Sequence, residues 1–175
     1  MNTLRLSRIA LFTSMLSIGT LLLPPIPIGD INITLQTLII MLCGLLLSPI
    51  DAFIAALLYL LLGIIGLPVF SGFRSGLGVI LGPTGGYLMA FPFAAFFISS
   101  LTKSQKFLPS LIITFVFGVC FIHLIGVLFM SLYYEKSFFI ILLTSAIFIP
   151  FDIIKCIIAS MLSNRLRLID YFKRT

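Results

Sequence analysis

The chain alternates between long apolar runs and short interruptions that contain polar residues, glycine or proline. Six runs are long enough to form hydrophobic helices, with ends fixed by the pattern to within a few residues. The second and third runs are short, and "LSPID" separates them because Pro49 interrupts a continuous helix. The predicted helical segments lie at about 7–23, 33–47, 51–66, 77–100, 107–132 and 137–163.

Composition identifies the solvent of these helices. Hydrophobic residues make up 61% of the 175 residues and charged residues only 9%, whereas a soluble domain carries about 25% charged residues. A helix that crosses a bilayer needs roughly 20 apolar residues, so six such helices occupy nearly the whole chain. We therefore expect an all-α membrane protein with six transmembrane helices in one domain, residues 1–175, surrounded by lipid.

The basic residues indicate the orientation of the helices. The formal net charge of +6 does not indicate a nucleic-acid partner, because the cations cluster at the chain ends and in one short loop. The positive-inside rule then places the N-terminus and the C-terminus in the cytoplasm. The expected cytoplasmic cations are Arg5, Arg8, Lys103, Lys106, Arg165, Arg167, Lys173 and Arg174, and the expected outer cations are Arg74 and Lys136.

Two charged residues lie inside the sixth apolar run. Asp152 and Lys155 are three residues apart, so they share one face of a helix. Each charge costs roughly 2.5–3.5 kcal/mol at mid-membrane on the insertion scale, and a partner or a polar interior must offset that cost. Pro150 removes one backbone donor and loosens the helix beside them. Two interpretations stay open: a ligand site, or an ion pair that only joins helices.

A single cation, Arg74, stands in the glycine-rich stretch 66–91, which contains seven glycines. If this stretch folds back over the bundle, Arg74 approaches the outer part of the sixth helix. Asp152, Lys155 and Arg74 together carry a net charge of +1, which suits a small monoanion. Arginine offers a planar fork for a carboxylate, lysine offers a mobile point charge, and aspartate accepts an N–H.

Other motifs exclude several classes of function. No phosphate-binding loop and no dinucleotide-binding fingerprint is present, and no catalytic triad or carboxylate pair can be argued for, so we expect neither an enzyme nor a cofactor. The lone His123 lacks further metal ligands at useful spacing, so we expect a packing or polar-contact role and no metal site. The cysteines Cys43, Cys120 and Cys156 lie in apolar runs, which predicts small buried side chains.

The first segment carries small residues on one face. Ala10, Ser14 and Ser17 are spaced so that another helix can approach closely. The approaching helix is either another part of the same bundle or a second membrane subunit.

Three stretches together resemble a known family: "ITLQTLIIMLCGLLLSP" (33–49), "LYLLLGIIGLPVFSGFRSGLGVILGPTGGYLMAFP" (58–92) and "PFDIIKCIIA" (150–159). They are similar to the BioY family, the biotin-specific substrate-binding subunits (S components) of energy-coupling-factor transporters. The resemblance implies a multi-pass protein of the bacterial cytoplasmic membrane that binds biotin near its outer face. It also implies a transmembrane coupling subunit and two ATPase subunits as partners.

The resemblance also suggests roles for individual residues. S components meet the coupling subunit through an A-x-x-x-A face, and "ALFTS" matches it at Ala10 but departs from it at Ser14. The chain therefore either docks on a coupling subunit or takes up biotin alone. If the ligand is biotin, as the resemblance implies, we expect Asp152 to accept a ureido N–H and Lys155 and Arg74 to bind the carboxylate. The alternative partner of Lys155 is the ureido oxygen. The further expected site residues are Tyr87, Gly85 and Gly86 in the wall, Gln36 and Thr37 at a lid, and Tyr59.

Two alternatives to biotin uptake remain. In the first, the chain is an S component for another small carboxylate or vitamin. In the second, it is a non-transport membrane protein in which the Asp152–Lys155 pair is purely structural.

Overall fold

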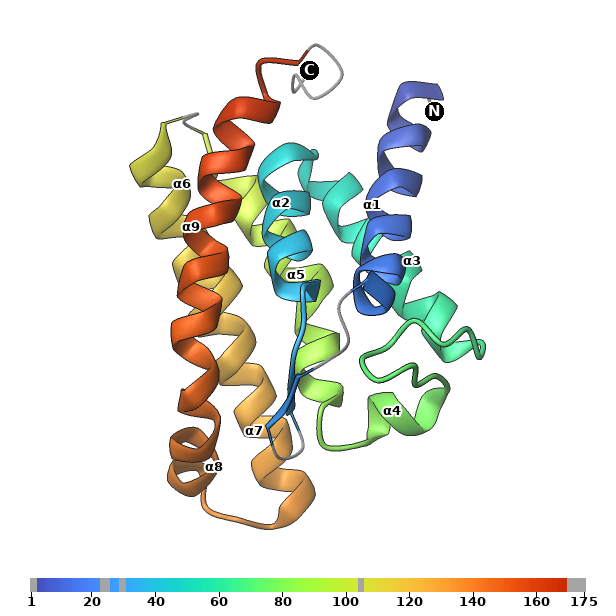
Figure 1. The fold of residues 1–175 in the computed structure, drawn as a ribbon, viewed down its shortest axis with the longest axis vertical. Coiled ribbons are helices and arrows are strands. Elements are labelled where there is room, and N and C mark those ends of the chain that lie inside the picture. Colours follow the sequence, from blue (N-terminus) through green and yellow to red (C-terminus); the bar gives the residue numbers. More distant parts are fainter. Residues whose placement is uncertain (1–2, 23–25, 29–30, 104–105, 170–175) are drawn as a thin grey trace.

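The protein is described here by a computed structural model, which defines residues 3–22, 26–28, 31–103 and 106–169. Its long helices follow one another in alternating directions (Figure 1). Two of the runs are continuous but change helix type along their length. The helices are α1 (Thr3–Leu22), α2 (Gln36–Leu46), α3 (Pro49–Ile64), α4 (Leu77–Leu81), α5 (Gly85–Leu101), α6 (Phe107–Thr114), the π-helix η1 (Phe115–Phe121), α7 (Ile122–Tyr134), α8 (Phe138–Ser145), the 3₁₀ helix η2 (Ala146–Phe148) and α9 (Ile149–Leu166).

A small hairpin modifies the all-α prediction. Strands β1 (Ile26–Ile28) and β2 (Ile31–Ile33) pair antiparallel, with Ile26 opposite Ile33. The second predicted helix therefore does not begin at 33. The helix α2 begins at Gln36, whose backbone N–H donates to Thr34 Oγ1 at 3.3 Å. β-branched isoleucines favour the extended conformation that precedes this start.

The fourth predicted segment, 77–100, is not one helix. Helix α4 ends at Leu81, Gly82 is extended with ψ 179°, and α5 begins at Gly85. A residue before proline avoids the helical region, so Gly82 must leave the helix ahead of Pro83. The chain then turns back so tightly that a Cβ on Gly85 would collide with the carbonyl of Ile80. Only glycine fits there.

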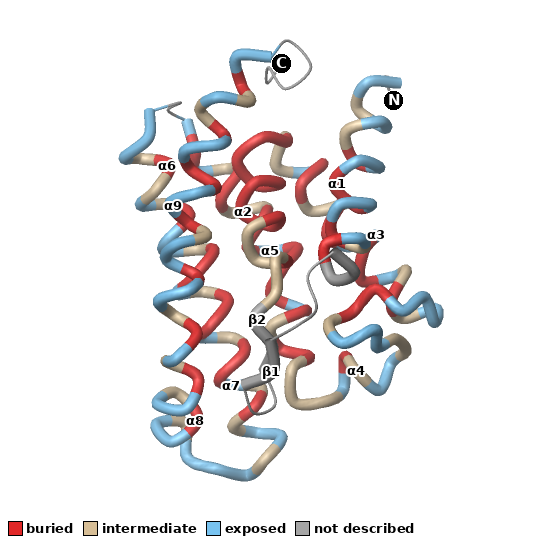
Figure 2. Tube along the Cα trace, viewed as in Figure 1, coloured by how far each residue is buried: buried red, intermediate tan, exposed pale blue. Residues whose placement is uncertain are grey.

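Helix α2 forms the centre of the molecule. Nearly all of its residues are buried, and Figure 2 shows it among the most buried parts of the tube. It packs against α5 and α9, and the closest approach is at Gly44. A Cβ there would lie 2.7 Å from Ile98 Cβ and 2.9 Å from the carbonyl of Ala95. The missing side chain lets the backbones of α2 and α5 come together, an effect of small residues that is well known from pairs of membrane helices.

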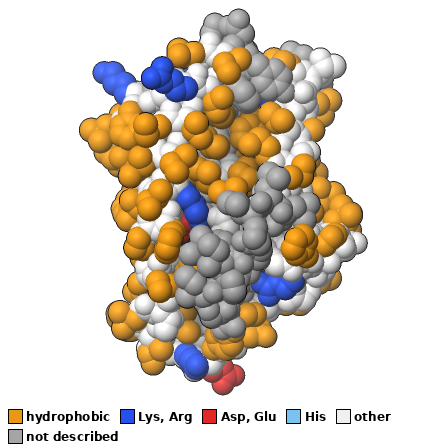
Figure 3. All heavy atoms as spheres, viewed as in Figure 1, with side chains coloured by type: hydrophobic (Ala, Val, Ile, Leu, Met, Phe, Trp, Pro, Cys, Tyr) orange, Lys and Arg blue, Asp and Glu red, His pale blue; other side chains and the backbone are white. Residues whose placement is uncertain are grey.

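The outer surface is largely apolar. Large hydrophobic side chains are exposed along α7 and α9, and hydrophobic atoms cover much of the face in Figure 3. Among the described residues, Phe107–Tyr134 and Phe138–Leu166 are the helical runs long and apolar enough to span a membrane. Cys120 lies on this surface rather than in the interior, which corrects its prediction as a buried side chain. An apolar residue on a lipid-facing helix needs no burial, so an apolar run alone cannot place it.

Polar contacts join the helices at the end of the molecule where α1 begins and α9 ends (Figure 1). Arg5 Nε lies 2.5 Å from Asp51 Oδ1, which links α1 to α3. Arg167, at the end of α9, donates through Nη2 to the carbonyl of Leu45 in the last turn of α2. That carbonyl has no partner within its own helix. The bundle is therefore fastened by directional contacts at this end.

Replacing Gly44 by alanine should lower the free energy of unfolding by about 1–3 kcal/mol, the usual cost of forcing extra atoms into a packed interface. The reason is that the new Cβ meets a backbone oxygen, which cannot move away cheaply. The measurement is the thermal unfolding midpoint in detergent. The matched control is Gly78→Ala, since a Cβ at Gly78 meets nothing within 4 Å. Equal stability of the two variants would contradict the α2–α5 packing.

Candidate functional site

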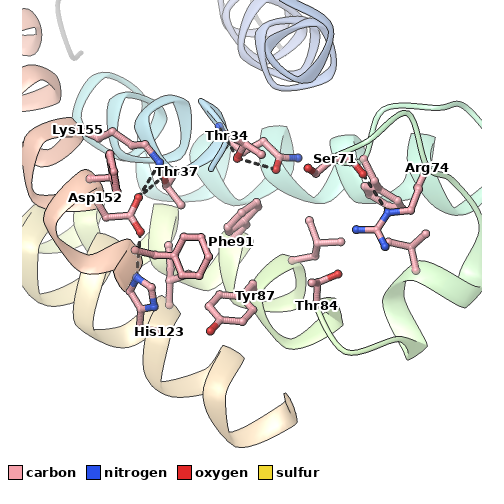
Figure 4. Close-up of a pocket in the computed structure, with 17 residues that line it drawn as sticks. Thr34, Thr37, Ser71, Arg74, Thr84, Tyr87, Phe91, His123, Asp152 and Lys155 are labelled. Carbon is pink, nitrogen blue, oxygen red and sulfur yellow. Dashed lines mark hydrogen bonds and ion pairs between the residues drawn. The ribbon is translucent and has the colours of Figure 1, made fainter. Parts of the chain in front are cut away.

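A cavity opens between the first turns of α2, α5, α7 and α9 and the segment that precedes α4. Its empty volume is about 720 Å³, a figure that includes the solvent at its open mouth. Figure 4 shows its lining, with polar groups at two sides and apolar groups between them. The lining residues are Thr34, Gln36, Thr37, Phe70, Ser71, Arg74, Val79, Thr84, Tyr87, Leu88, Phe91, Ile122, His123, Phe148, Phe151, Asp152 and Lys155.

One side of the cavity holds a compact charge cluster. Lys155 Nζ lies 2.8 Å from Asp152 Oδ1. Thr37 Oγ1 donates to the same oxygen at 2.9 Å and accepts from Lys155 Nζ at 3.0 Å. The aspartate and lysine side chains are only 8% and 13% exposed. The two opposite charges neutralise each other, and the threonine hydroxyl hydrogen-bonds to both ions. These contacts offset much of the cost of placing ions in an apolar bundle.

His123 completes this cluster from α7. Its Nε2 lies 2.9 Å from Asp152 Oδ2, and its side chain is 9% exposed. The sequence predicted a packing or polar contact for this residue but did not place it in the site. A usable signal was present, because an ionisable side chain in an apolar helix is a functional candidate by the same rule that singled out Asp152.

Arg74 lies on the opposite side of the cavity from Asp152 and Lys155 (Figure 4). It is exposed, and a backbone bridge to Phe70 holds its segment through hydrogen bonds of 3.0 and 3.3 Å. Its Nε donates to the carbonyl of Ser71 at 3.0 Å. Within the described chain, no carboxylate lies at ion-pair distance from it. Its guanidinium therefore keeps donors available for a ligand.

Aromatic and aliphatic side chains separate the two polar sides. Tyr87, Leu88 and Phe91 line the cavity from α5, and Phe148 and Phe151 line it from η2 and α9. Tyr87 also meets His123 edge to face, with ring centroids 5.8 Å apart. Tyr87, predicted as part of the wall of the binding site, thus lines the cavity together with its helical neighbours.

Gly85 and Gly86, in contrast, do not line the cavity. Gly85 serves the tight return from α4, as described above. A Cβ on Gly86 would meet Phe129 and would lie 2.9 Å from the carbonyl of Ile125. Both glycines therefore permit close packing behind the wall. Because they lack side chains, the two glycines affect the site only indirectly, through this packing.

Gln36 and Tyr59 form a second polar contact at the side of the cavity. Gln36 lines the cavity, while Tyr59 is fully buried behind it. Gln36 Nε2 donates to the Tyr59 hydroxyl, which donates to the carbonyl of Val69 at 3.2 Å. Thr34 Oγ1 donates to Gln36 Oε1 at 3.1 Å. Tyr59 therefore orients Gln36. The lid predicted at Gln36 and Thr37 stays a prediction, and both residues line the cavity.

The predicted docking residues lie away from this cavity. Ala10 and Ser14 are exposed on α1, whereas Ile9, Phe12 and Leu16 of the same helix are buried. Ser17 is half-buried and donates to the carbonyl of Thr13 at 2.9 Å.

The chemistry of the cavity is that of recognition. Asp152 accepts, Lys155 and Arg74 donate, and the surface between them is apolar. In the part of the chain that the structure describes, no three metal-ligating side chains lie close enough to hold an ion. A ligand that fits this arrangement has polar groups at both ends and an apolar middle.

Comparison with known proteins agrees with this geometry. Residues 1–170 match the family model described as the BioY family. A solved structure, the S-component for biotin from an ECF-type ABC transporter, superposes with a TM-score of 0.90 and 36% sequence identity, covering 97% of this chain and 93% of the other.

Two relatives extend the match across organisms. A probable biotin transporter from Pyrococcus horikoshii is 36% identical over 169 residues, 95% of this chain and 98% of the relative. A biotin transporter from Lactococcus lactis subsp. cremoris is 38% identical over 153 residues, 83% of this chain and 81% of the relative. The family model and both relatives cover most of the sequence, and so the chain is a member of the BioY family.

Proposed function

We propose that this chain binds biotin and takes it up across the membrane as the S component of an energy-coupling-factor transporter. The relatives are named as biotin transporters, and the superposed structure is that of a biotin S-component. The family is one of transport proteins rather than enzymes, and biotin is the cargo rather than a cofactor.

The separation of the two polar sides of the cavity carries this proposal. Biotin has a ureido ring with N–H donors and a carbonyl acceptor, an apolar bicycle and chain, and a terminal carboxylate. The Asp152–Lys155 pair offers an acceptor beside a donor, which matches the ureido ring. Arg74 lies across the cavity with free donors, which match the carboxylate. The apolar wall at Tyr87 lies between them.

This arrangement favours one of the two roles left open for Lys155. Its Nζ already contacts Asp152 and Thr37, which leaves one of its three hydrogens for a ligand. That hydrogen is beside the acceptor of the ureido N–H, so the ureido oxygen is its partner. Arg74 is then the one proposed partner of the biotin carboxylate. The total charge of Asp152, Lys155, Arg74 and a bound monoanion is zero.

For the topology we propose six crossings of the bacterial cytoplasmic membrane within one domain, residues 1–175, and cytoplasmic termini. The start of α1 and the end of α9 lie at the same end of the molecule, as an even number of crossings requires (Figure 1). The cations of both elements then meet the cytoplasmic side. The hairpin and α4 lie toward the other end, so the cavity faces outward.

The proposed partners are a transmembrane coupling subunit and two ATPase subunits, besides membrane lipid. The exposed Ala10 and Ser14 supply small side chains on the surface of α1, where a second helix can approach closely. Serine at the second position is still small enough for such contact. Uptake by the chain alone is the competing possibility.

Labelled biotin should bind the purified protein in detergent, and other vitamins should compete poorly. Arg74→Ala should weaken binding by at least about 10-fold, because a charge-assisted hydrogen bond is lost. The same substitution should not change the affinity for biotin methyl ester, which lacks the carboxylate. Equilibrium binding of both ligands measures the two effects.

Arg74→Lys provides the control, because lysine keeps the positive charge but lacks the planar set of N–H donors of arginine. Lys155→Ala should also weaken biotin binding. Unchanged affinity with reduced stability in Lys155→Ala would instead favour the purely structural ion pair. Tight binding of a different vitamin would indicate an S component for that ligand.

The topology predicts which introduced cysteines a membrane-impermeant maleimide can reach in intact cells. In a background with the native cysteines replaced, Lys136→Cys should be labelled from outside, and Lys103→Cys only after the membrane is opened. Both positions are exposed in the structure. Labelling of Lys103→Cys in intact cells would contradict the proposed orientation.

A further inference from the structure

The protein itself fills most of the acceptor capacity of Asp152. An ionised carboxylate has about four lone-pair positions on its two oxygens. Oδ1 accepts from Thr37 and Lys155, and Oδ2 accepts from His123 Nε2, which must carry the hydrogen because the carboxylate cannot donate. One position, on Oδ2, is left for a ligand. His123 determines the direction in which that position points.

Without His123, the carboxylate would be held at one oxygen only. The terminal torsion of an aspartate side chain is soft and has broad minima. Both other donors, Thr37 and Lys155, act on Oδ1, so they leave Oδ2 free to swing. The contact of 2.9 Å from His123 removes that freedom. It also occupies the second lone pair of Oδ2, which would otherwise compete for the ligand.

The structure also holds His123 in place from its other side. Tyr87 meets the imidazole edge to face at an interplanar angle of 88°. Gly126, one turn further along α7, has no side chain, and a Cβ there would collide with the Tyr87 ring. Tyr87 can therefore pack directly on α7 beside His123. The His123 side chain, 9% exposed, is fixed between this ring and the carboxylate.

We propose that His123 is a positioning residue for ligand recognition, which orients Asp152 so that one lone pair of Oδ2 faces a ureido N–H. This inference rests on the proposed biotin site. A positioning role differs from a packing role because it affects the interactions at only one end of the ligand, the ureido ring. Loss of the His123 hydrogen bond should weaken interactions with the ureido ring and leave those with the carboxylate unchanged.

A matched pair of substitutions tests this role. Methionine and glutamine are both unbranched and similar in length, but only glutamine can donate a hydrogen bond. His123→Met should weaken biotin binding by about 10- to 100-fold, the effect of losing one hydrogen bond to a charged group. His123→Gln should remain close to the wild-type protein. Cys120→Ser, on the exposed face one turn earlier, is the control for substitution in this helical run.

Ligand analogues separate positioning from a general structural effect. His123→Met should weaken biotin and biotin methyl ester by the same factor. It should hardly change the weak binding of biotin methylated on both ureido nitrogens, which has no N–H to offer. Thermal unfolding midpoints of all variants in detergent show whether each one is folded.

The outcomes are distinguishable. An equal loss for all three ligands, or folded glutamine and methionine variants that bind alike, would overturn the positioning role while the biotin assignment stands. Failure of the folded wild-type protein to bind biotin would overturn the proposed function and this inference together.

Discussion

The balance of one buried negative charge organises the site. Asp152 lies in an apolar bundle where an isolated carboxylate would be costly. Its partners lie on three helices: Thr37 on α2, His123 on α7, and Lys155 on α9, the helix that carries Asp152 itself. These helices must keep their spacing for every contact to survive. The close packing of α2 at the centre of the bundle, made possible by Gly44, supplies that rigidity.

Much of the fold could be predicted from hydrophobic runs because lipid-exposed helices need apolar side chains on most faces. Pro49 marked the junction of α2 and α3, since proline is well suited to the first turn of a helix. The break at Gly82 and Pro83 was missed because both flanks are apolar, and an apolar run does not reveal where the backbone turns. The start of α2 was predicted three residues early for the same reason, since Ile33, the last residue of β2, is apolar too.

The candidate site was predictable where a residue violated the apolar pattern. Asp152, Lys155 and Arg74 did so, and all three line the cavity. Residues whose role depends on contacts between distant segments were harder to predict. His123 needed its pairing across two helices to be recognised, and Tyr59 acts through Gln36 from a buried position. Spacing within one segment carries no information about such contacts, because they join helices that meet only in the folded bundle.

The shortness of α2 has a consequence for the distance a ligand must travel. An eleven-residue helix is about 17 Å long, little more than half of the roughly 30 Å hydrocarbon core of a bilayer. Its first turn borders the cavity, and its last turn points toward the end of the molecule where α1 begins. A ligand in the cavity is therefore separated from the last turn of α2 by about 17 Å, the length of that helix. Under the proposed topology, this length is the part of the path that remains for any movement after binding.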